Sequence, residues 1–167
     1  MTHDTNNYWE QLERLEKLIR AAEFKAGVIF SFHSLILGLF ADRISNYQSL
    51  FLEDRIFLIL AILWLLSVMI SIFYCFKCFM PNMELKYSTN VFFFKDAAHE
   101  FDSPKSYSKE LIKTCIDEDK MVSMLSEQIH AESVIIEKKF FNIKRAFQFF
   151  IISFVFMVFT LLYWIFA

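Results

Sequence analysis

The sequence has few residues that make sharp turns, because only two glycines and two prolines occur among its 167 residues. This scarcity favours long helices over strands joined by tight turns. The three cysteines are too few, and odd in number, for a disulfide framework. Residues 1–20 are polar and contain no apolar core of a cleavable signal peptide. A net charge of -2 provides no global basic field for nucleic acid.

Charge is also almost absent from three stretches, at 26–41, 56–76 and 146–167. A membrane-spanning helix needs roughly 20 apolar residues. The second and third stretches meet this length, whereas the first needs residues 21–25 to complete a span. The 22 phenylalanines and the 56% hydrophobic content exceed what the interior of a soluble domain of this size accommodates. The sequence therefore predicts three transmembrane helices in a lipid bilayer.

Basic residues are distributed unevenly around these stretches. They gather before the first stretch and next to the inner ends of the other two, whereas the loop at 42–55 has two arginines and three acidic residues. Because Lys and Arg accumulate on the cytoplasmic side, the N-terminus is expected in the cytoplasm. The C-terminus is then expected at the outer face of a bacterial inner membrane.

Helical periodicity continues outside the apolar stretches. Trp9, Leu12, Leu15 and Ile19 recur at helical spacing, which predicts an amphipathic helix that packs against another helix. A second helix is expected from 117 to 167, with a break near Asn142 as an alternative. Its apolar stripe consists of Leu125, Ile129, Ile136, Phe140, Ile143 and Phe147.

Together these patterns predict an all-α integral membrane protein. The fold has three transmembrane helices, an N-terminal amphipathic helix and a long cytoplasmic helix that continues into the last span. The expected divisions are a cytoplasmic amphipathic helix at 1–22, a transmembrane hairpin at 23–80 with spans at about 23–41 and 56–77, a cytoplasmic helical region at 81–145, and the third transmembrane helix at 146–167.

Small residues line one face of the first span, at Gly27, Ser31, Ser34 and Gly38. Small residues allow close helix packing in lipid, but the same face can line a hydrated pore. Glu23 extends this face, and a ring of Glu23 in an oligomer predicts a mouth that attracts cations.

Other polar residues in the spans have simpler interpretations. His33 lies deep in the first span, where a hydrogen bond to a neighbouring helix is favoured over a role in a water pathway. Cys75 and Cys78 match a C-x-x-C motif, but no second pair or nearby histidine completes a metal site. These cysteines are interpreted as small packing residues.

Catalytic motifs are not recognisable in the sequence. His99-Glu100 and His130-Ala131-Glu132 are the nearest histidine–carboxylate pairs, and residues one or two apart on a helix do not face each other. We therefore expect neither enzymatic activity nor a cofactor or a metal site.

Three segments carry a family resemblance. AEFKA at 22–26 enters the first span, Pro81 is followed by NVFFF at 90–94, and LSEQIH at 125–130 precedes the last span. Four further positions, Ser133, Ile135, Lys139 and Phe140, continue the third segment. In this order and spacing, the chain resembles the Pycsar transmembrane effector family, with Glu23 where that family usually has Asp.

The resemblance implies a bacterial anti-phage effector controlled by a nucleotide or oligonucleotide second messenger from a partner cyclase or nucleotidyltransferase. Activation would then permeabilise or depolarise the inner membrane. Three spans cannot enclose a pore alone, so a conducting form is expected to be a homo-oligomer, with a tetramer as the first model. The alternative is a non-conducting anchor that recruits a soluble partner through its cytoplasmic helix.

A ligand of this kind must bind outside the spans. The resemblance suggests basic residues for its phosphates and aromatic residues for stacking on its bases. The alternative is that the basic residues contact anionic lipid head groups. The candidates are Lys86, Tyr87, Asn90, Phe92, Lys95, Lys138, Lys139, Lys144 and Arg145.

Overall fold

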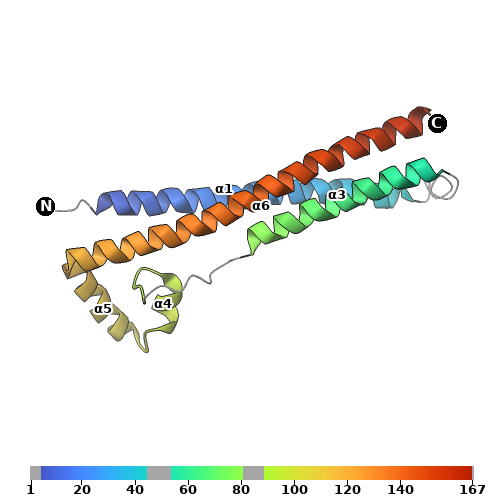
Figure 1. The fold of residues 1–167 in the computed structure, drawn as a ribbon. Helices are drawn as coiled ribbons and strands as arrows, with labels where there is room; N and C mark the ends of the chain where they lie inside the picture. The colour runs from blue at the N-terminus through green and yellow to red at the C-terminus, as the bar shows by residue number, and fades with distance from the viewer. Residues whose placement is uncertain (1–4, 45–53, 81–88, 167) are drawn as a thin grey trace. The chain divides into compact units, whose positions relative to one another are not determined.

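The computed structural model describes residues 5–44, 54–80 and 89–166, and these residues form helices and no strands (Figure 1). The helices are α1 (Asn6–Asp42), α3 (Arg55–Phe79), α4 (Phe94–His99), α5 (Pro104–Ile116) and α6 (Glu118–Phe166). Three of them, α1, α3 and α6, are long and apolar enough to cross a membrane. The predicted all-α fold with three membrane-spanning helices is confirmed.

Helix α1 contains both the amphipathic segment and the first apolar stretch without interruption. In its polar half Leu15 is buried, whereas Glu13 and Lys17 are exposed and form an ion pair at 2.7 Å. Ala22 and Ala26, at the start of the apolar stretch, are strong helix formers, so the helix continues through this point.

Helix α6 runs for 49 residues and has no break near Asn142. Three members of its predicted apolar stripe are buried: Leu125, Ile136 and Ile143. Phe147, the last member of the stripe, is exposed in the single chain, and its neighbour Ala146 is buried. The buried positions follow the 3.6-residue period of the helix, which also brings Lys139 into the interior.

The chain divides into two compact units. One consists of Met1–Arg20 and Asn82–Glu137, and the other of Ala21–Pro81 and Lys138–Ala167. We call these the non-spanning unit and the spanning unit. Helices α1 and α6 each contribute residues to both.

The core of the spanning unit is built mainly from small side chains. Small residues let helix backbones approach closely. Its buried members are Ala22, Ala26, Ile29, Cys75, Cys78, Ile143 and Ala146. The hydroxyl of Ser71 on α3 donates a hydrogen bond to the carbonyl oxygen of Ala146 on α6 at 2.8 Å, which links these helices directly.

The start of α3 is capped by Asp54. Its carboxylate accepts hydrogen bonds from the backbone N–H groups of Ile56 at 2.8 Å and Phe57 at 3.3 Å. Such a cap satisfies donors that have no partner inside the helix. The phenol of Tyr163 donates to the same carboxylate at 2.6 Å, so the end of α6 is joined to the start of α3.

The non-spanning unit is organised around Asn90. Its side-chain amide donates to the carbonyl oxygen of Met124 on α6 at 2.7 Å, and its side-chain oxygen accepts from the N–H of Phe92 at 2.9 Å. The backbone N–H of Asn90 donates to Asp96 of α4 at 2.8 Å. Asn90 therefore fixes the segment before α4 against α6.

Candidate functional site

A partly buried ion pair joins all three helices of the spanning unit. The ammonium of Lys139 on α6 donates to the carboxylate of Glu23 on α1 at 2.8 Å and to the carbonyl oxygen of Cys78 on α3 at 2.6 Å. The side chain of Lys139 is 8% exposed and that of Glu23 is 40% exposed. We call these three residues the polar junction.

The energetics of the polar junction differ from those of a surface ion pair. An exposed pair contributes about 0–1 kcal/mol. Removing one partner of a buried pair costs about 3–5 kcal/mol, because the other charge is left without compensation. The junction therefore links the three helices through contacts that are costly to break.

The predicted pore face of α1 points largely away from the chain's own core. Ser31, Ser34 and Gly38 are exposed, and Gly27 is half-buried. A Cβ atom at Gly38 would meet no neighbour within 4 Å, and one at Gly27 would lie 3.9 Å from Cζ of Phe79. Neither glycine is required for close packing inside a single chain.

Small residues of the other two spans behave differently. Those in α3 and in the spanning part of α6 that are buried are Ala61, Ser67, Ser71, Cys75, Cys78, Ala146 and Ser153. Thr160 is half-buried, and its hydroxyl donates to the carbonyl oxygen of Phe156 at 2.8 Å. Among the described spans, α1 is thus the helix whose small polar face is exposed.

A shallow groove of about 490 Å³ follows part of this face. It is lined by Phe24, Gly27, Val28, Ser31, Phe32 and Leu35. Glu23, predicted to extend the face, takes part in the polar junction. The pore-lining role of Glu23, Gly27, Ser31, Ser34 and Gly38 stays a prediction.

The ring of His33 is 1% exposed and packs edge-on against Phe150 of α6, with 5.2 Å between ring centroids. Within the described residues its Nε2 atom has no hydrogen-bond partner. The expected hydrogen bond to a neighbouring helix is therefore not formed at this nitrogen, and an aromatic contact takes its place.

The predicted ligand residues fall into distinct environments. Lys86 and Tyr87 lie outside the described residues. Asn90 and Phe92 take part in packing, since Asn90 is 3% exposed and Phe92 meets Trp9 edge-on at 5.5 Å between ring centroids. Lys139 is committed to the polar junction. The four candidates that are exposed are Lys95, Lys138, Lys144 and Arg145.

The non-spanning unit has a cavity of about 790 Å³ that none of these candidates lines. Its walls come from the segment before α4, the loop after α4, and helices α5 and α6. The lining residues are Thr89, Val91, Phe101, Ser106, Glu110, Lys120, Ser123, Met124 and Glu127.

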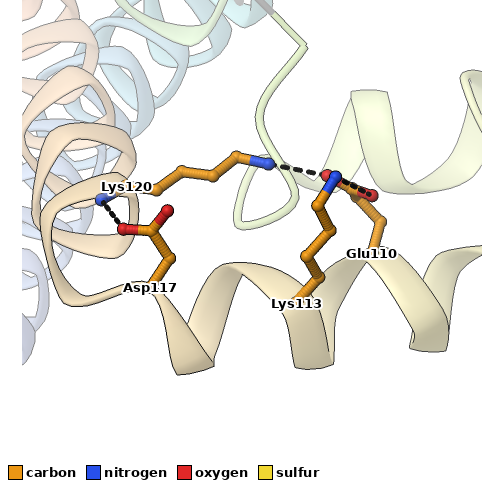
Figure 2. A network of polar contacts seen from close by, with 4 residues as sticks. All are labelled: Glu110, Lys113, Asp117 and Lys120. Atoms are coloured by element: carbon orange, nitrogen blue, oxygen red, sulfur yellow. Dashed lines mark hydrogen bonds and ion pairs between the residues drawn. The ribbon is translucent and has the colours of Figure 1, made fainter.

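A polar network borders this cavity (Figure 2). The ammonium of Lys120 donates to Glu110 at 2.6 Å, and Lys113 lies 3.9 Å from the second oxygen of Glu110. The hydrogen bond from Lys120 holds the pKa of Glu110 below its ordinary value. Asp117 accepts from the backbone N–H of Lys120 at 3.1 Å, which positions the first turn of α6.

Sequence reasoning missed both the polar junction and the cavity. A signal for the junction exists, because Lys139 falls at helical spacing between Ile136 and Ile143. No comparable signal connects Glu110 with Lys120, because Asp117 interrupts the helical phase between them.

Glu132 is a second partly buried carboxylate in the non-spanning unit. Burial raises its pKa, a hydrogen bond from Gln128 at 2.9 Å opposes this rise, and repulsion from Glu16 adds to it. Its Oε2 atom is buried and has no hydrogen-bond partner among the described residues. The ionised form of Glu132 is therefore poorly solvated.

Metal-ligating residues do not cluster in the described part of the chain, where no three His, Cys, Asp or Glu side chains come together. Cys75 and Cys78 are buried free cysteines. Their positions in the spanning core agree with the packing role expected from the sequence.

A comparison with protein families assigns this chain to a family. A family model described as Pycsar effector protein domain matches residues 7–166. No curated protein and no solved structure matches the chain. The family and the three helices able to cross a membrane suggest a non-enzymatic membrane effector in a nucleotide-signalling context. The chain belongs to the Pycsar effector protein domain family and has the role of an anti-phage effector.

Proposed function

We propose that this chain is the subunit of a homo-oligomeric channel or pore in the bacterial inner membrane. A nucleotide or oligonucleotide signal from a partner cyclase or nucleotidyltransferase controls its opening, and the open form depolarises or permeabilises the membrane. The observation that carries this proposal is the exposed small polar face of α1, at Ser31, Ser34 and Gly38.

Exposed small polar residues in a span call for a partner other than lipid. They gain little from contact with acyl chains, whereas close helix packing or water satisfies them. The hydroxyl of Ser34 already donates to the carbonyl oxygen of Phe30 at 3.0 Å, so this residue can face a pore or another helix without an unsatisfied donor. Copies of α1 arranged around an axis bring these faces together, with a tetramer as the first model.

The polar junction is our candidate for the gate. Glu23 lies one helical turn before Gly27 on α1, and Lys139 belongs to α6, which also contributes to the non-spanning unit. A signal that shifts α6 would change the pairing of Lys139 with Glu23. Released Glu23 carboxylates would then face the pore and attract cations.

Ligand phosphates are expected to meet the exposed basic residues. Lys95, Lys138, Lys144 and Arg145 are accessible, whereas binding at Lys139 requires the polar junction to open. In the cavity of the non-spanning unit, the two lining carboxylates, Glu110 and Glu127, outnumber the one lining lysine, Lys120, and this excess of negative charge disfavours a phosphate there. The N-terminus is cytoplasmic in this proposal, and the C-terminus lies at the outer face.

Ion flux into liposomes tests the proposal. Purified protein is reconstituted with and without candidate nucleotides, and its oligomeric state is measured in detergent. Ser31→Leu and Gly38→Leu should abolish flux, because added side chains block the small face while meeting open space in the single chain. Val155→Trp adds comparable bulk at an exposed position of α6 and should leave flux unchanged.

The outcomes separate the channel from an anchor. Flux that depends on a nucleotide and is lost in both α1 variants supports the channel. A monomer with no flux under any condition overturns it. If flux persists in both Ser31→Leu and Gly38→Leu, ions do not pass along the small face of α1.

A further inference from the structure

A second cavity lies at the end of the spanning unit remote from the polar junction. Its volume is about 440 Å³, within the range of about 300–1,000 Å³ typical of ligand pockets. All three spanning helices line it. The lining residues are Ile36, Leu39, Phe40 and Arg43 of the α1 end, Phe57, Ala61 and Trp64 of α3, and Met157, Thr160, Leu161 and Trp164 of α6.

We call this cavity the crevice, and most of its lining side chains are apolar. Phe57, Ala61 and Trp64 form a buried floor, with exposures of 3%, 8% and 5%. Leu161 and Trp164 are about half exposed on the wall formed by α6. Protein interiors leave few voids larger than a water molecule, and an apolar void of this size gains by being filled.

One charged residue lines the crevice in the described part of the chain. Arg43 has a side chain that is 68% exposed, and it forms an ion pair with Asp42 at 3.7 Å, which solvent screens because Asp42 is 80% exposed. No carboxylate is among the described lining residues. A guanidinium beside an apolar crevice matches a phosphate attached to an acyl chain.

We propose that this crevice binds one acyl chain of an anionic phospholipid, with the lipid phosphate on Arg43. A lipid fits better than a helix of a second copy, because a basic residue at the end of an apolar slot complements a lipid's charged head and apolar tail. Trp164, near the end of α6, supports this assignment, since tryptophan favours the level of the lipid head groups. The bound lipid fills the space between the ends of α1, α3 and α6.

The crevice and the α1 small face are separate surfaces, because they share no residue. Bound lipid therefore does not depend on whether the protein conducts ions. Loss of lipid binding and loss of flux can be distinguished by measuring both on the same preparation.

Tryptophan quenching by brominated acyl chains tests the proposal. The full chain with Trp9→Phe and Trp164→Phe keeps Trp64 as its only tryptophan. Trp64 is 5% exposed, so bulk lipid reaches it poorly, whereas a chain in the crevice contacts it. Vesicles contain either brominated phosphatidylglycerol or brominated phosphatidylcholine. Stronger quenching by phosphatidylglycerol is expected.

Two pairs of variants sharpen the test. Arg43→Gln should lower the preference for phosphatidylglycerol about 5-fold, the factor that corresponds to about 1 kcal/mol per basic residue near an anionic membrane. Arg55→Gln, at the start of α3 and outside the crevice lining, should not. Ala61→Phe should abolish quenching by filling the crevice, whereas Ile62→Phe, at an exposed position, should not.

Quenching that is equal for both lipids and unchanged in Ala61→Phe would overturn the proposal. If Trp64 is protected from both lipids and the protein is oligomeric, a second copy of the chain fills the crevice instead. Retention of phosphatidylglycerol after detergent exchange, counted by native mass spectrometry, gives an independent readout. Arg43→Gln should reduce this retention.

Discussion

Two helix faces in the spanning unit carry small residues, and they differ in burial. On α3, Ser67, Ser71, Cys75 and Cys78 are buried against the chain's own helices. On α1, the small residues Ser31, Ser34 and Gly38 recur at a similar helical spacing, and they are exposed. Small residues therefore mark a helix surface suited to close approach, but they do not specify what approaches it.

The difference lies in the neighbours of each face. Ser71 bonds to the backbone of α6, and the carbonyl oxygen of Cys78 accepts from Lys139, so α3 is tied to α6 by directional bonds. Among the described residues, the exposed part of the α1 face has no such link to another helix of the chain. The α3 face therefore packs inside the chain, whereas the described helices of the same chain leave the α1 face uncovered.

The largest loss of stability is expected from a substitution in the polar junction, where α3 is bonded to α6 through Lys139. Glu23→Leu leaves Lys139 buried without its carboxylate and should lower the free energy of unfolding by about 3 kcal/mol, the low end for a buried pair because Glu23 is 40% exposed. Chemical unfolding in detergent micelles, followed by circular dichroism, measures this loss.

Two further variants control for the loss of charge. Adding Lys139→Met to Glu23→Leu should recover most of the stability, because no buried charge remains. Glu13→Gln, which breaks the exposed pair with Lys17, should leave the free energy of unfolding nearly unchanged, because solvent screens this pair. If Glu23→Leu and Glu13→Gln lower the free energy of unfolding equally, the polar junction contributes no more than an exposed ion pair.

A matched pair of substitutions compares the two faces directly. Ser71→Leu inserts a large side chain at a fully buried position and should cost about 1–3 kcal/mol. Ser31→Leu makes the same change on the exposed face and should stay within about 0.5 kcal/mol in a monomeric detergent state. Equal costs at the two positions would contradict the division of roles.

A pH-dependent effect is expected outside both faces, at Glu132. Because its pKa is raised, the folded chain binds the proton more tightly than the unfolded chain, so the ionised carboxylate destabilises the fold above the raised pKa. Glu132→Gln removes the charge and leaves a neutral amide, so it should raise the free energy of unfolding by about 1 kcal/mol at neutral pH, because an unsatisfied buried group costs more when it is charged.

The benefit of Glu132→Gln should disappear as the pH falls through the raised pKa and below the ordinary glutamate value of about 4.3. Thermal unfolding at both pH values checks this trend, since 1 kcal/mol shifts Tm by about 2–4 °C for a chain of this size. The exposed Glu137→Gln serves as the control. A gain that persists at low pH would contradict the assignment to ionisation.

The smallest effect concerns one hydrogen bond between helices. Ser71→Ala removes the bond to the carbonyl oxygen of Ala146 and should cost about 0.6 kcal/mol, the average for such bonds in membranes. Ser67→Ala removes a bond at 2.8 Å to the carbonyl oxygen of Leu63 in the same helix. Its cost should be smaller, because no second helix is released.

Much of the fold followed from the sequence because lipid imposes a length and polarity rule on each segment. Charge-free stretches predicted the three helices able to span a membrane, and the scarcity of glycine and proline predicted that α6 is long. Phe147 shares the apolar stripe of α6 with buried residues and is itself exposed, because an apolar side chain faces lipid as readily as it faces a core. In a membrane, hydropathy does not separate these two environments.

By itself, the sequence determined that the chain is helical, has three segments long and apolar enough to cross a membrane, and belongs to the Pycsar effector protein domain family. These features depend on segment length, hydropathy and the order of motifs along the chain. Only the tertiary structure decided that Lys139 pairs with Glu23, 116 residues away, and that the small face of α3 is buried while that of α1 is exposed. Those outcomes depend on which side of each helix meets another helix, and periodicity within one helix does not specify its neighbour.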